Sequence, residues 1–394
     1  MSDDFTDFDR SAMARAVDIA RNGLDTTHPN PRVGCVLARD GKIIGEGWHE
    51  RAGGPHAEIV ALRNVASVGA AGATAYVTLE PCSHHGRTPP CVDALIEARV
   101  GRVVFAMRDP DRRVSGRGAD ALAKAGIVTQ TGLMTDAAQE LNVGYLKRMR
   151  TGRPWVRVKL AMSLDGRTAL ANGASQWITG EAAREDVQHW RARSSAVLTG
   201  IGTVLADNPR LDVRLPGATR QPLRVVLDST LRTPANARLF DTVGDLVLIA
   251  ANGDSSQVAA SGQQASALLS REPRFSLSDA DFEYRAAALR NQGARVERVT
   301  GATRPDLRAV LSRLAQLEMN EVLLEAGPEL SGAFVGEGLV DELLLYVAPK
   351  ILGPQARALL DLPALTELGA APGFTIVEET RIGEDLRLRL RPAR

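Results

Sequence analysis

The sequence has little cysteine, few aromatic residues and almost no net charge, and each shortage excludes a class of protein. Three cysteines in 394 residues are an odd number and too few for a disulfide framework. Aromatic residues make up 4%, and the net charge of +1 offers no basic surface for nucleic acid. No uncharged apolar run approaches the roughly 18 residues of a membrane span. The acidic N-terminus does not resemble a signal peptide. We therefore expect a cytoplasmic protein with no nucleic-acid and no membrane partner.

A cluster of polar residues is present between Pro55 and Cys91. His56 is followed by Glu58, and Pro81 by Cys82, with Cys91 further on. One imidazole and two thiols supply three zinc ligands; a structural site normally has a fourth protein ligand, whereas a catalytic site leaves a position for water. Glu58 can reach that water without binding the metal. The pattern predicts catalytic zinc, with a structural zinc site or a chance cluster as the alternative.

His84 and His85 bear on this choice, because either could supply a fourth ligand. We expect them instead to contact substrate or lie in a solvated loop. The remaining cysteine, Cys35, stands in an apolar, strand-like run and is predicted to be a buried thiol.

Zinc-dependent nucleobase deaminases carry the signature H-x-E followed by P-C-x-x-C, with a non-ligating Glu as proton shuttle. Here eight residues, instead of two, separate Cys82 from Cys91. Together with the run Thr27-His28-Pro29-Asn30-Pro31-Arg32-Val33-Gly34, the motifs resemble the deaminase half of the bifunctional riboflavin-biosynthesis deaminase–reductases, in which the long spacing is expected. The resemblance implies that Glu58 is catalytic, that His56, Cys82 and Cys91 bind Zn²⁺, and that Asn30 lines the pyrimidine pocket. It also places the loop of residues 108–111 and 116–118 beside that pocket.

Helical and strand patterns alternate through the first half, which predicts an α/β layered domain. Predicted helices cover 7–21, 57–65, 92–100 and 119–125; predicted strands cover 33–37, 42–45, 75–79, 102–107 and 127–129. The basic segment 146–154 ends in Gly and Pro, and we place the domain boundary there. The expected domains are 1–150, a zinc-dependent pyrimidine deaminase, and 151–394, an NADPH-dependent reductase.

The second half begins with Lys159-Leu160-Ala161-Met162-Ser163-Leu164-Asp165-Gly166, which resembles the first strand and loop of a dihydrofolate-reductase-like fold. The family's reductase half has this fold. The expected fold class is therefore a cytidine-deaminase-like α/β/α domain followed by a dihydrofolate-reductase-like α/β domain. We also expect a helix at 181–193, a loop at 204–209, a half-buried edge strand at 384–390, and a Ser/Ala/Gln-rich insertion at 252–281.

The resemblance also implies contacts in the reductase half. NADPH would meet Ala161, Trp177, Thr203, Asp207, Ser229, Gly327, Pro328, Glu329 and Leu330. Substrate would meet Ser175, Arg191, Leu211, Arg214 and Glu325. Both arginines are always charged and suit bidentate phosphate binding, with a surface salt bridge as the alternative. Lys159, Asp207 and Glu325 are candidate proton donors. Asn208 and Ala326 depart from the family's usual Asp and Gly.

The implied function is deamination of a diamino-ribosylamino-pyrimidinone 5′-phosphate, then NADPH reduction of the ribosyl group to ribityl. The expected partners are this phosphorylated small molecule and, from the resemblance, further copies of the chain in a homo-oligomer. One alternative is a tRNA or nucleoside deaminase with an unrelated second domain, which would want an aromatic-bearing basic face. Another is a non-catalytic zinc-stabilised binding protein, in which Glu58 would be dispensable.

Overall fold

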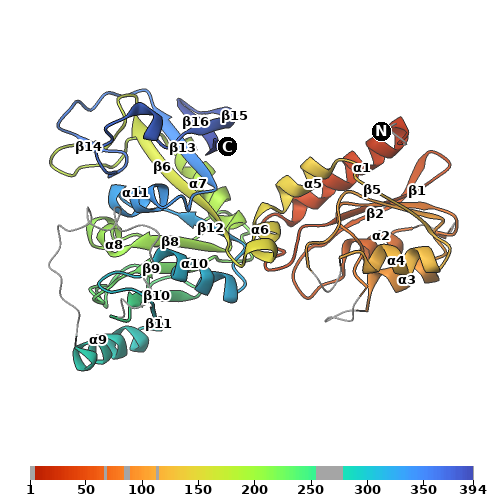
Figure 1. The fold of residues 1–394 in the computed structure, drawn as a ribbon, viewed down its shortest axis with the longest axis horizontal. Helices are drawn as coiled ribbons and strands as arrows, with labels where there is room; N and C mark the ends of the chain where they lie inside the picture. The colour runs from red at the N-terminus through yellow and green to blue at the C-terminus, as the bar shows by residue number, and fades with distance from the viewer. Residues whose placement is uncertain (1–4, 66–68, 84–88, 112–114, 254–277, 394) are drawn as a thin grey trace. The chain divides into compact units, whose positions relative to one another are not determined.

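A computed structural model describes residues 5–65, 69–83, 89–111, 115–253 and 278–393. The chain divides into two compact units, Met1–Gly152 and Arg153–Arg394, and each is described by itself (Figure 1). Among the described residues, no helix combines the length and the apolar character needed to span a bilayer.

The first unit is built on a five-stranded sheet in the order β2-β1-β3-β4-β5. Its strands are β1 (Gly34–Arg39), β2 (Lys42–Trp48), β3 (Thr74–Val77), β4 (Arg102–Phe105) and β5 (Val128–Thr131). The β1–β2 hairpin turns at Asp40 and Gly41, both with positive φ, as a two-residue hairpin turn requires. β3, β4 and β5 are parallel, so the loops that follow β3 and β4 leave the same edge of the sheet.

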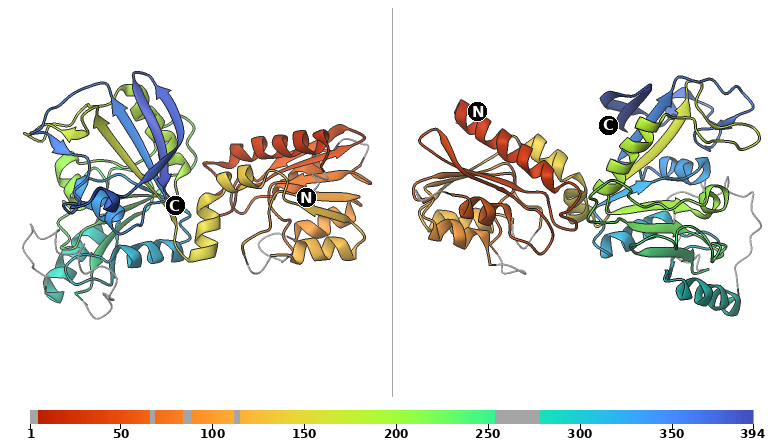
Figure 2. Two further views of the ribbon diagram at one scale, coloured as in Figure 1. Left: turned by 45° about the horizontal axis from the view of Figure 1, so that its top comes forward. Right: turned by 180° about the vertical axis from the view of Figure 1, so that it is seen from behind.

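Helices cover both faces of this sheet. They are α1 (Asp7–Ala20), the 3₁₀ turn η1 (Arg21–Gly23), α2 (Ala57–Arg63), α3 (Cys91–Glu97), α4 (Arg117–Lys124), α5 (Thr135–Leu141) and α6 (Val143–Thr151). Apolar residues of α1, α5 and α6 form one core, and those of α2, α3 and α4 form the core on the opposite face. Figures 1 and 2 show the resulting helix–sheet–helix layers.

The second unit contains a nine-stranded sheet in the order β11-β10-β9-β8-β12-β6-β13-β16-β15 and a small β14–β7 pair. The large-sheet strands are β6 (Trp155–Ser163), β8 (Ala196–Gly200), β9 (Leu223–Leu227), β10 (Leu246–Ala251), β11 (Arg295–Val299), β12 (Glu321–Leu324), β13 (Glu342–Ala348), β15 (Phe374–Ile382) and β16 (Asp385–Pro392); β7 (Arg167–Ala169) and β14 (Arg357–Ala358) form the pair. All neighbours from β11 to β13 are parallel.

Two hydrophobic cores flank this sheet. The helices are α7 (Glu181–Arg193), α8 (Ile201–Asp207), α9 (Asp279–Asn291), α10 (Leu307–Gln316), α11 (Pro328–Gly336) and the 3₁₀ turn η3 (Leu368–Ala370). Apolar residues of α10 and α11 pack on one face, and those of α7, α8 and α9 on the other. The predicted fold class, two α/β domains of these layered types, is confirmed.

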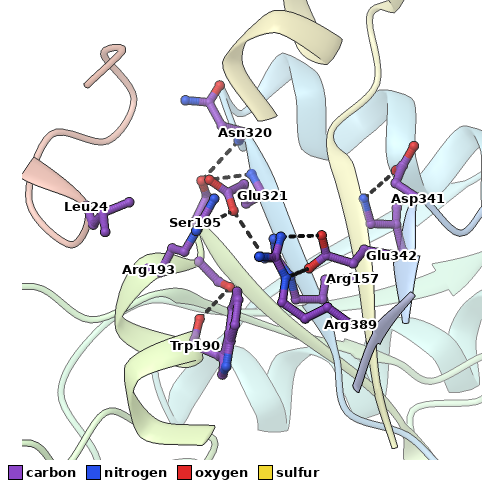
Figure 3. Close-up of polar contacts among 12 residues, drawn as sticks. Leu24, Arg157, Trp190, Arg193, Ser195, Asn320, Glu321, Asp341, Glu342 and Arg389 are labelled. Atoms are coloured by element: carbon purple, nitrogen blue, oxygen red, sulfur yellow. Dashed lines mark hydrogen bonds and ion pairs between the residues drawn. The ribbon is translucent and has the colours of Figure 1, made fainter. Parts of the chain in front are cut away.

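A buried ionic network lies where β6, β12 and β13 begin (Figure 3). Arg157 is fully buried and donates to Glu342 at 2.5 Å and to Glu321 at 3.1 Å. Arg193 and Arg389 add bonds to these two glutamates, and the Trp190 ring lies 4.5 Å below the Arg157 guanidinium carbon. Each buried charge in the network has a partner of opposite sign, and this pairing offsets the free-energy cost of removing the charges from water. The network connects strands β6, β12 and β13 to helix α7 and strand β16.

Four sequence-based expectations for local structure are corrected. Residues 146–151 of the predicted boundary segment belong to helix α6, and residues 204–207 of the predicted loop belong to α8. The predicted insertion ends earlier than expected, because α9 begins at Asp279. Residues 254–277 lie outside the described residues. The strand predicted at the sheet edge, β16, pairs on both sides, with β13 and β15, so β15 is the edge strand.

Candidate active sites

Three separate elements bring the predicted zinc ligands together in the first unit. His56 is the N-cap residue of α2, Cys91 is the first residue of α3, and Cys82 lies in the loop after β3. Their ligand atoms all lie within 4.8 Å of one another. Pro55 lies directly before His56, the N-cap residue of α2, and Pro90 is itself the N-cap of α3. The backbone at both N-cap residues is extended, so each helix begins only at the residue that follows.

The spacing fits zinc. The His56 Nδ1 atom lies 3.1 Å from Cys91 Sγ and 3.5 Å from Cys82 Sγ. Tetrahedral zinc bonds of about 2.1 Å to nitrogen and 2.3 Å to sulfur place such atoms about 3.5 Å apart. Among the described residues the group contains these three ligands and no more. His84 and His85, considered as a fourth ligand, lie outside the described residues.

The surroundings of Cys82 and Cys91 shift the pKa values of their thiols in opposite directions. A hydrogen bond from the Cys91 side chain and one from His56 together outweigh the opposing effect of burial and lower the pKa of Cys82 to about 4. The backbone N–H of Cys91 also donates to Cys82 Sγ at 3.3 Å. The same sulfur–sulfur hydrogen bond, together with burial, raises the pKa of Cys91. A bound cation would favour the thiolate form of both cysteines.

Glu58 lies in the first turn of α2, beside the ligands but outside the group of converging ligand atoms. It is 4% exposed, and burial raises its pKa, with the nearby Cys82 acting in the same direction and His56 opposing it. A buried carboxyl group whose pKa is raised is suited to exchange protons near neutral pH.

His49, which the sequence analysis did not single out, orients Asn30, the residue predicted to contact the pyrimidine. His49 Nδ1 lies 2.9 Å from the carbonyl oxygen of Pro55, which can only accept a hydrogen bond. In a neutral ring the other nitrogen, Nε2, is then an acceptor, and it lies 3.0 Å from the Asn30 side-chain amide nitrogen. This contact fixes which end of the Asn30 amide faces His49. His49, directly after β2, carried no sequence signal for this role.

In the second unit, every residue predicted to contact cofactor or substrate lines one cavity of about 2190 Å³. The cavity lies at the carboxyl ends of the parallel strands β9, β8 and β12, where ligands bind in open α/β sheets. Ser229 follows β9, Thr203 lies in α8 after β8, and Gly327 follows β12. A Cβ at Gly327 would meet nothing within 4 Å, so the backbone there is open to a bound group.

Lys159, Glu325 and Arg191 form a charged group in this cavity. Glu325 receives two bonds from Arg191, at 2.6 and 2.9 Å, and Arg191 also donates to the carbonyl of Asp212 at 3.0 Å. Burial lowers the pKa of Lys159; the charge of Glu325 opposes this shift and that of Arg191 adds to it. Lys159 Nζ also lies 5.9 Å from the centre of the Tyr346 ring. Lys159 is thus an ammonium group made more acidic than usual.

The two predicted phosphate-binding arginines differ. Arg191 is 9% exposed, and its Nε and Nη2 atoms both donate to Glu325. The bidentate edge of the guanidinium, which was expected to bind phosphate, is therefore already occupied. The Arg214 side chain is 51% exposed and pairs with Asp212 at 2.6 Å. Arg214 is therefore the arginine of the two that can reach a ligand in the cavity.

Trp177 presents a flat apolar surface at the cavity. Its side chain is 62% exposed, and the Arg184 guanidinium carbon lies 4.5 Å from its ring centre. Lys350 Nζ donates to the carbonyls of Trp177 and Ile178 at 2.9 and 2.7 Å and holds this segment in place. Lys350 was missed because a lysine in a loop far along the chain carries no sequence signal for this contact.

Comparisons with known proteins match both halves of the chain. Residues 6–107 match the family described as cytidine and deoxycytidylate deaminase zinc-binding region, and residues 154–388 match the RibD C-terminal domain. The second match excludes the alternative in which the second domain is unrelated to the deaminase.

Full-length relatives show the same pairing of domains. The chain is 46% identical to riboflavin biosynthesis protein RibD of Escherichia coli, over 97% of this chain and 99% of the relative. It is 44% identical to that of Haemophilus influenzae, over 99% of each. Among solved structures, Acinetobacter baumannii RibD is similar with 41% identity and a TM-score of 0.84, covering 98% of this chain and 99% of the other. A Thermotoga maritima diaminohydroxyphosphoribosylaminopyrimidine deaminase/5-amino-6-(5-phosphoribosylamino)uracil reductase has 30% identity and a TM-score of 0.80, with the same coverage.

Proposed function

Because this chain belongs to the RibD family, the bifunctional deaminase–reductases of riboflavin biosynthesis, we propose how its own residues divide the two reactions. Residues 1–150 form the zinc-dependent deaminase domain and residues 151–394 the NADPH-dependent reductase domain. The substrate is 2,5-diamino-6-ribosylamino-4(3H)-pyrimidinone 5′-phosphate, whose amino group leaves as ammonia before the ribosyl group is reduced to ribityl.

In the deaminase, His56, Cys82 and Cys91 hold zinc, and Asn30, oriented by His49, holds the pyrimidine. Zinc in such a site supplies Lewis acidity, which makes water acidic enough to act as a nucleophile near neutral pH. The Glu58 carboxylate takes the proton from the attacking water and returns it to the nitrogen of the leaving amino group. Burial of Glu58 supports this role, because it brings the two protonation states of the carboxyl group closer in free energy near neutral pH.

In the reductase, the cofactor lies along the cavity between Trp177, Thr203, Asp207 and the turn at Gly327, with Ala161, Ser229 and residues 328–330 as further contacts. NADPH supplies a hydride, which the sugar accepts at C1′. The ring oxygen that leaves C1′ needs a proton, and Lys159 donates it, because burial makes its ammonium group unusually acidic. The pair Glu325–Arg191 keeps that ammonium in place. Arg214 holds the 5′-phosphate, while Ser175 and Leu211 contact the rest of the substrate.

The observation that carries this proposal is the convergence of His56, Cys82 and Cys91 beside a buried Glu58 that is not part of the ligand group. The test incubates the purified chain with the diaminopyrimidinone phosphate, with and without NADPH. Ammonia should appear in both samples, and NADPH absorbance should fall only after ammonia is released. Absence of ammonia would refute the deaminase assignment.

A second test concerns the proton donor. Lys159→Met should leave NADPH binding intact, measured by fluorescence titration, and abolish NADPH consumption with the deaminated intermediate. Consumption at the wild-type rate would mean that another group gives the proton. A matched control is Lys42→Met, an exposed lysine of the first unit.

The cellular location and the oligomeric state belong to the same proposal. We place the protein in the cytoplasm, where a reducing environment keeps Cys82 and Cys91 available as metal ligands. We also expect a homo-oligomer, as the family resemblance implies; light scattering of the purified protein measures this, and a monomer mass would contradict it.

A further inference from the structure

The segment of residues 175–179 forms one wall of the reductase cavity, because all five of its residues line that cavity. Two bonds hold its C-terminal end. The Gly180 N–H donates to the buried Asp385 carboxylate at 2.7 Å, and the Thr179 carbonyl accepts from Arg184 at 2.9 Å. The middle of the segment is bonded to a more distant part of the chain.

Lys350, in the loop after β13, supplies the bonds to the middle of the segment. Its Nζ donates to the carbonyl oxygens of Trp177 and Ile178 at 2.9 and 2.7 Å. An ammonium group has three donors, so two of the three serve this one segment. Hydrogen bonds from a charged donor are stronger than those between neutral groups, although water weakens them at an exposed residue such as Lys350.

The loop that carries Lys350 is itself bonded to the turn after β6. β6 and β13 are parallel neighbours, so the turn and the loop leave the same edge of the sheet. The Asp165 carboxylate accepts from the N–H groups of Leu352 at 3.1 Å and Gly353 at 2.7 Å. The Leu164 N–H donates to the Lys350 carbonyl at 2.8 Å. Asp165 belongs to the motif by which the second half resembles a dihydrofolate-reductase-like fold, and the proposed reactions give it no role.

We propose that Lys350, supported by Asp165, is a positioning residue of the reductase, which holds the Trp177 ring in place for the bound cofactor. The inference deepens the proposed function and rests on it, since Trp177 is there a contact of NADPH. Neither Lys350 nor Asp165 belongs to the described residues that line the cavity, so each acts through the segment 175–179. Because Trp177 is 62% exposed, burial contributes little to its position and the bonds to its backbone contribute more.

Loss of the Lys350 ammonium should weaken cofactor binding more than the chemical step. The proposed proton donor, Lys159, lies within β6, which pairs with β12 and β13 on its two sides. Arg214, the proposed phosphate contact, is paired with Asp212. Neither position depends on the Lys350 side chain, so kcat at saturating NADPH should stay near its wild-type value.

The test compares Lys350→Met with wild type, Lys350→Arg and Arg381→Gln in the full-length protein. Lys350→Met should raise the Kd of NADPH about tenfold by fluorescence titration, and the KM for NADPH similarly, because two carbonyls lose a charged donor. Lys350→Arg keeps a charged donor and should recover most of the affinity. Arg381→Gln removes another exposed cation that donates to a backbone carbonyl, and it should match wild type.

A double-mutant cycle shows whether Lys350 acts through Trp177. In a Trp177→Ala background, Lys350→Met should weaken NADPH binding by less than about twofold more, because the contact that Lys350 positions is already gone. An unchanged Kd in Lys350→Met would overturn the inference. A tenfold loss that persists in the Trp177→Ala background would also overturn it, since Lys350 would then act elsewhere.

A second variant tests the support from the turn after β6, and it serves also if Lys350→Met fails to fold. Asp165→Asn removes the charge that two backbone N–H groups share, and the Kd of NADPH should rise about three- to tenfold. An unchanged Kd would remove Asp165 from the inference. If wild type binds NADPH without consuming it, the proposed reductase reaction fails, while the Kd comparison still decides the role of Lys350. A wild type that binds no NADPH would overturn both.

Discussion

Glu58 is buried beside the three proposed metal ligands, yet it lies outside the group of ligand atoms that converge. That separation lets one residue set hold a cation while another residue moves a proton. In the reductase, different charged groups also have different roles. Glu325 and Arg191 satisfy each other, Lys159 keeps an acidic ammonium beside them, and Arg214 remains open to a ligand.

Glu58→Gln should retain zinc and lose ammonia release by at least about 10²- to 10⁴-fold, because the amide cannot take up the water proton. Zinc content by metal analysis and ammonia release by a coupled assay measure the two effects. Normal ammonia release in this variant would contradict the assigned role. Reduction of the deaminated intermediate by the same sample serves as the internal control.

Arg214→Gln should raise the reductase KM for phosphorylated substrate about 10- to 100-fold, because a charge-assisted hydrogen bond contributes about 1.5–3 kcal/mol. The KM for NADPH should stay near its wild-type value. Arg295→Gln, a change in an exposed ion pair on β11, is the matched control. An unchanged KM in Arg214→Gln would place the phosphate elsewhere in the cavity.

At the scale of elements, loops gain their positions from contacts with distant segments. Asp109, after β4, is held by the Tyr145 hydroxyl from α6, and Glu80, after β3, holds the start of α4. The segment with Trp177 is held by Lys350, after β13. In each case a polar side chain from one element satisfies groups of another, so the site walls depend on packing between elements far apart in sequence.

Asp109→Asn should stabilise the deaminase domain at neutral pH. Burial raises the pKa of Asp109 from 3.8 to about 6, so the folded state binds more protons than the unfolded state between these values. The free energy of unfolding therefore falls as pH rises through this window and stays lower above it. The neutral Asn lacks this fall and should gain about 3 kcal/mol over wild type near pH 7.5, and less near pH 4.5.

Urea denaturation monitored by Trp48 in the first unit measures this difference. Asp93→Asn, which changes an exposed aspartate on α3, is the matched surface control. An Asp109→Asn protein that is less stable than wild type near pH 7.5 would show that the bonds from Tyr145 and Asp111 require the charge.

For the whole molecule, the two reactions occupy separate units, Met1–Gly152 and Arg153–Arg394, with separate hydrophobic cores and separate chemical groups. The three proposed zinc ligands all lie in the first unit, and the cavity lining lies in the second. Each domain should therefore keep its activity when the other site is disabled.

Removal of zinc by a chelator should abolish ammonia release and leave NADPH-dependent reduction of the deaminated intermediate unchanged. Added zinc should restore ammonia release. Both rates are measured on the full-length protein before and after chelation. A parallel loss of the reductase activity would show that the second unit depends on the metal.

The amino-acid sequence by itself predicted the three converging side chains of the proposed zinc site and most elements, since ligand type and order, turn residues and apolar periodicity are local properties of the chain. His56, Cys82 and Cys91 could be named because metal binding restricts residue types so strongly, and Glu58 because it follows His56 in the H-x-E pattern. Helix 181–193 matches α7, because its ends are marked by the change of pattern at Gly180 and Ser194. By contrast, helix α6 carried a basic composition typical of linkers, and its burial against the sheet was not visible locally.

Only the tertiary structure decided which polar groups face each other. It paired Arg191 with Glu325, set His49 against Asn30, brought the backbone N–H groups of Asp109 and Gly116 to Glu80, and placed β16 between two strands. These pairings join residues separated by as many as 134 positions, and a hydrogen bond acts over about 3 Å. Such contacts follow from how the chain packs, and no local pattern of residues encodes them.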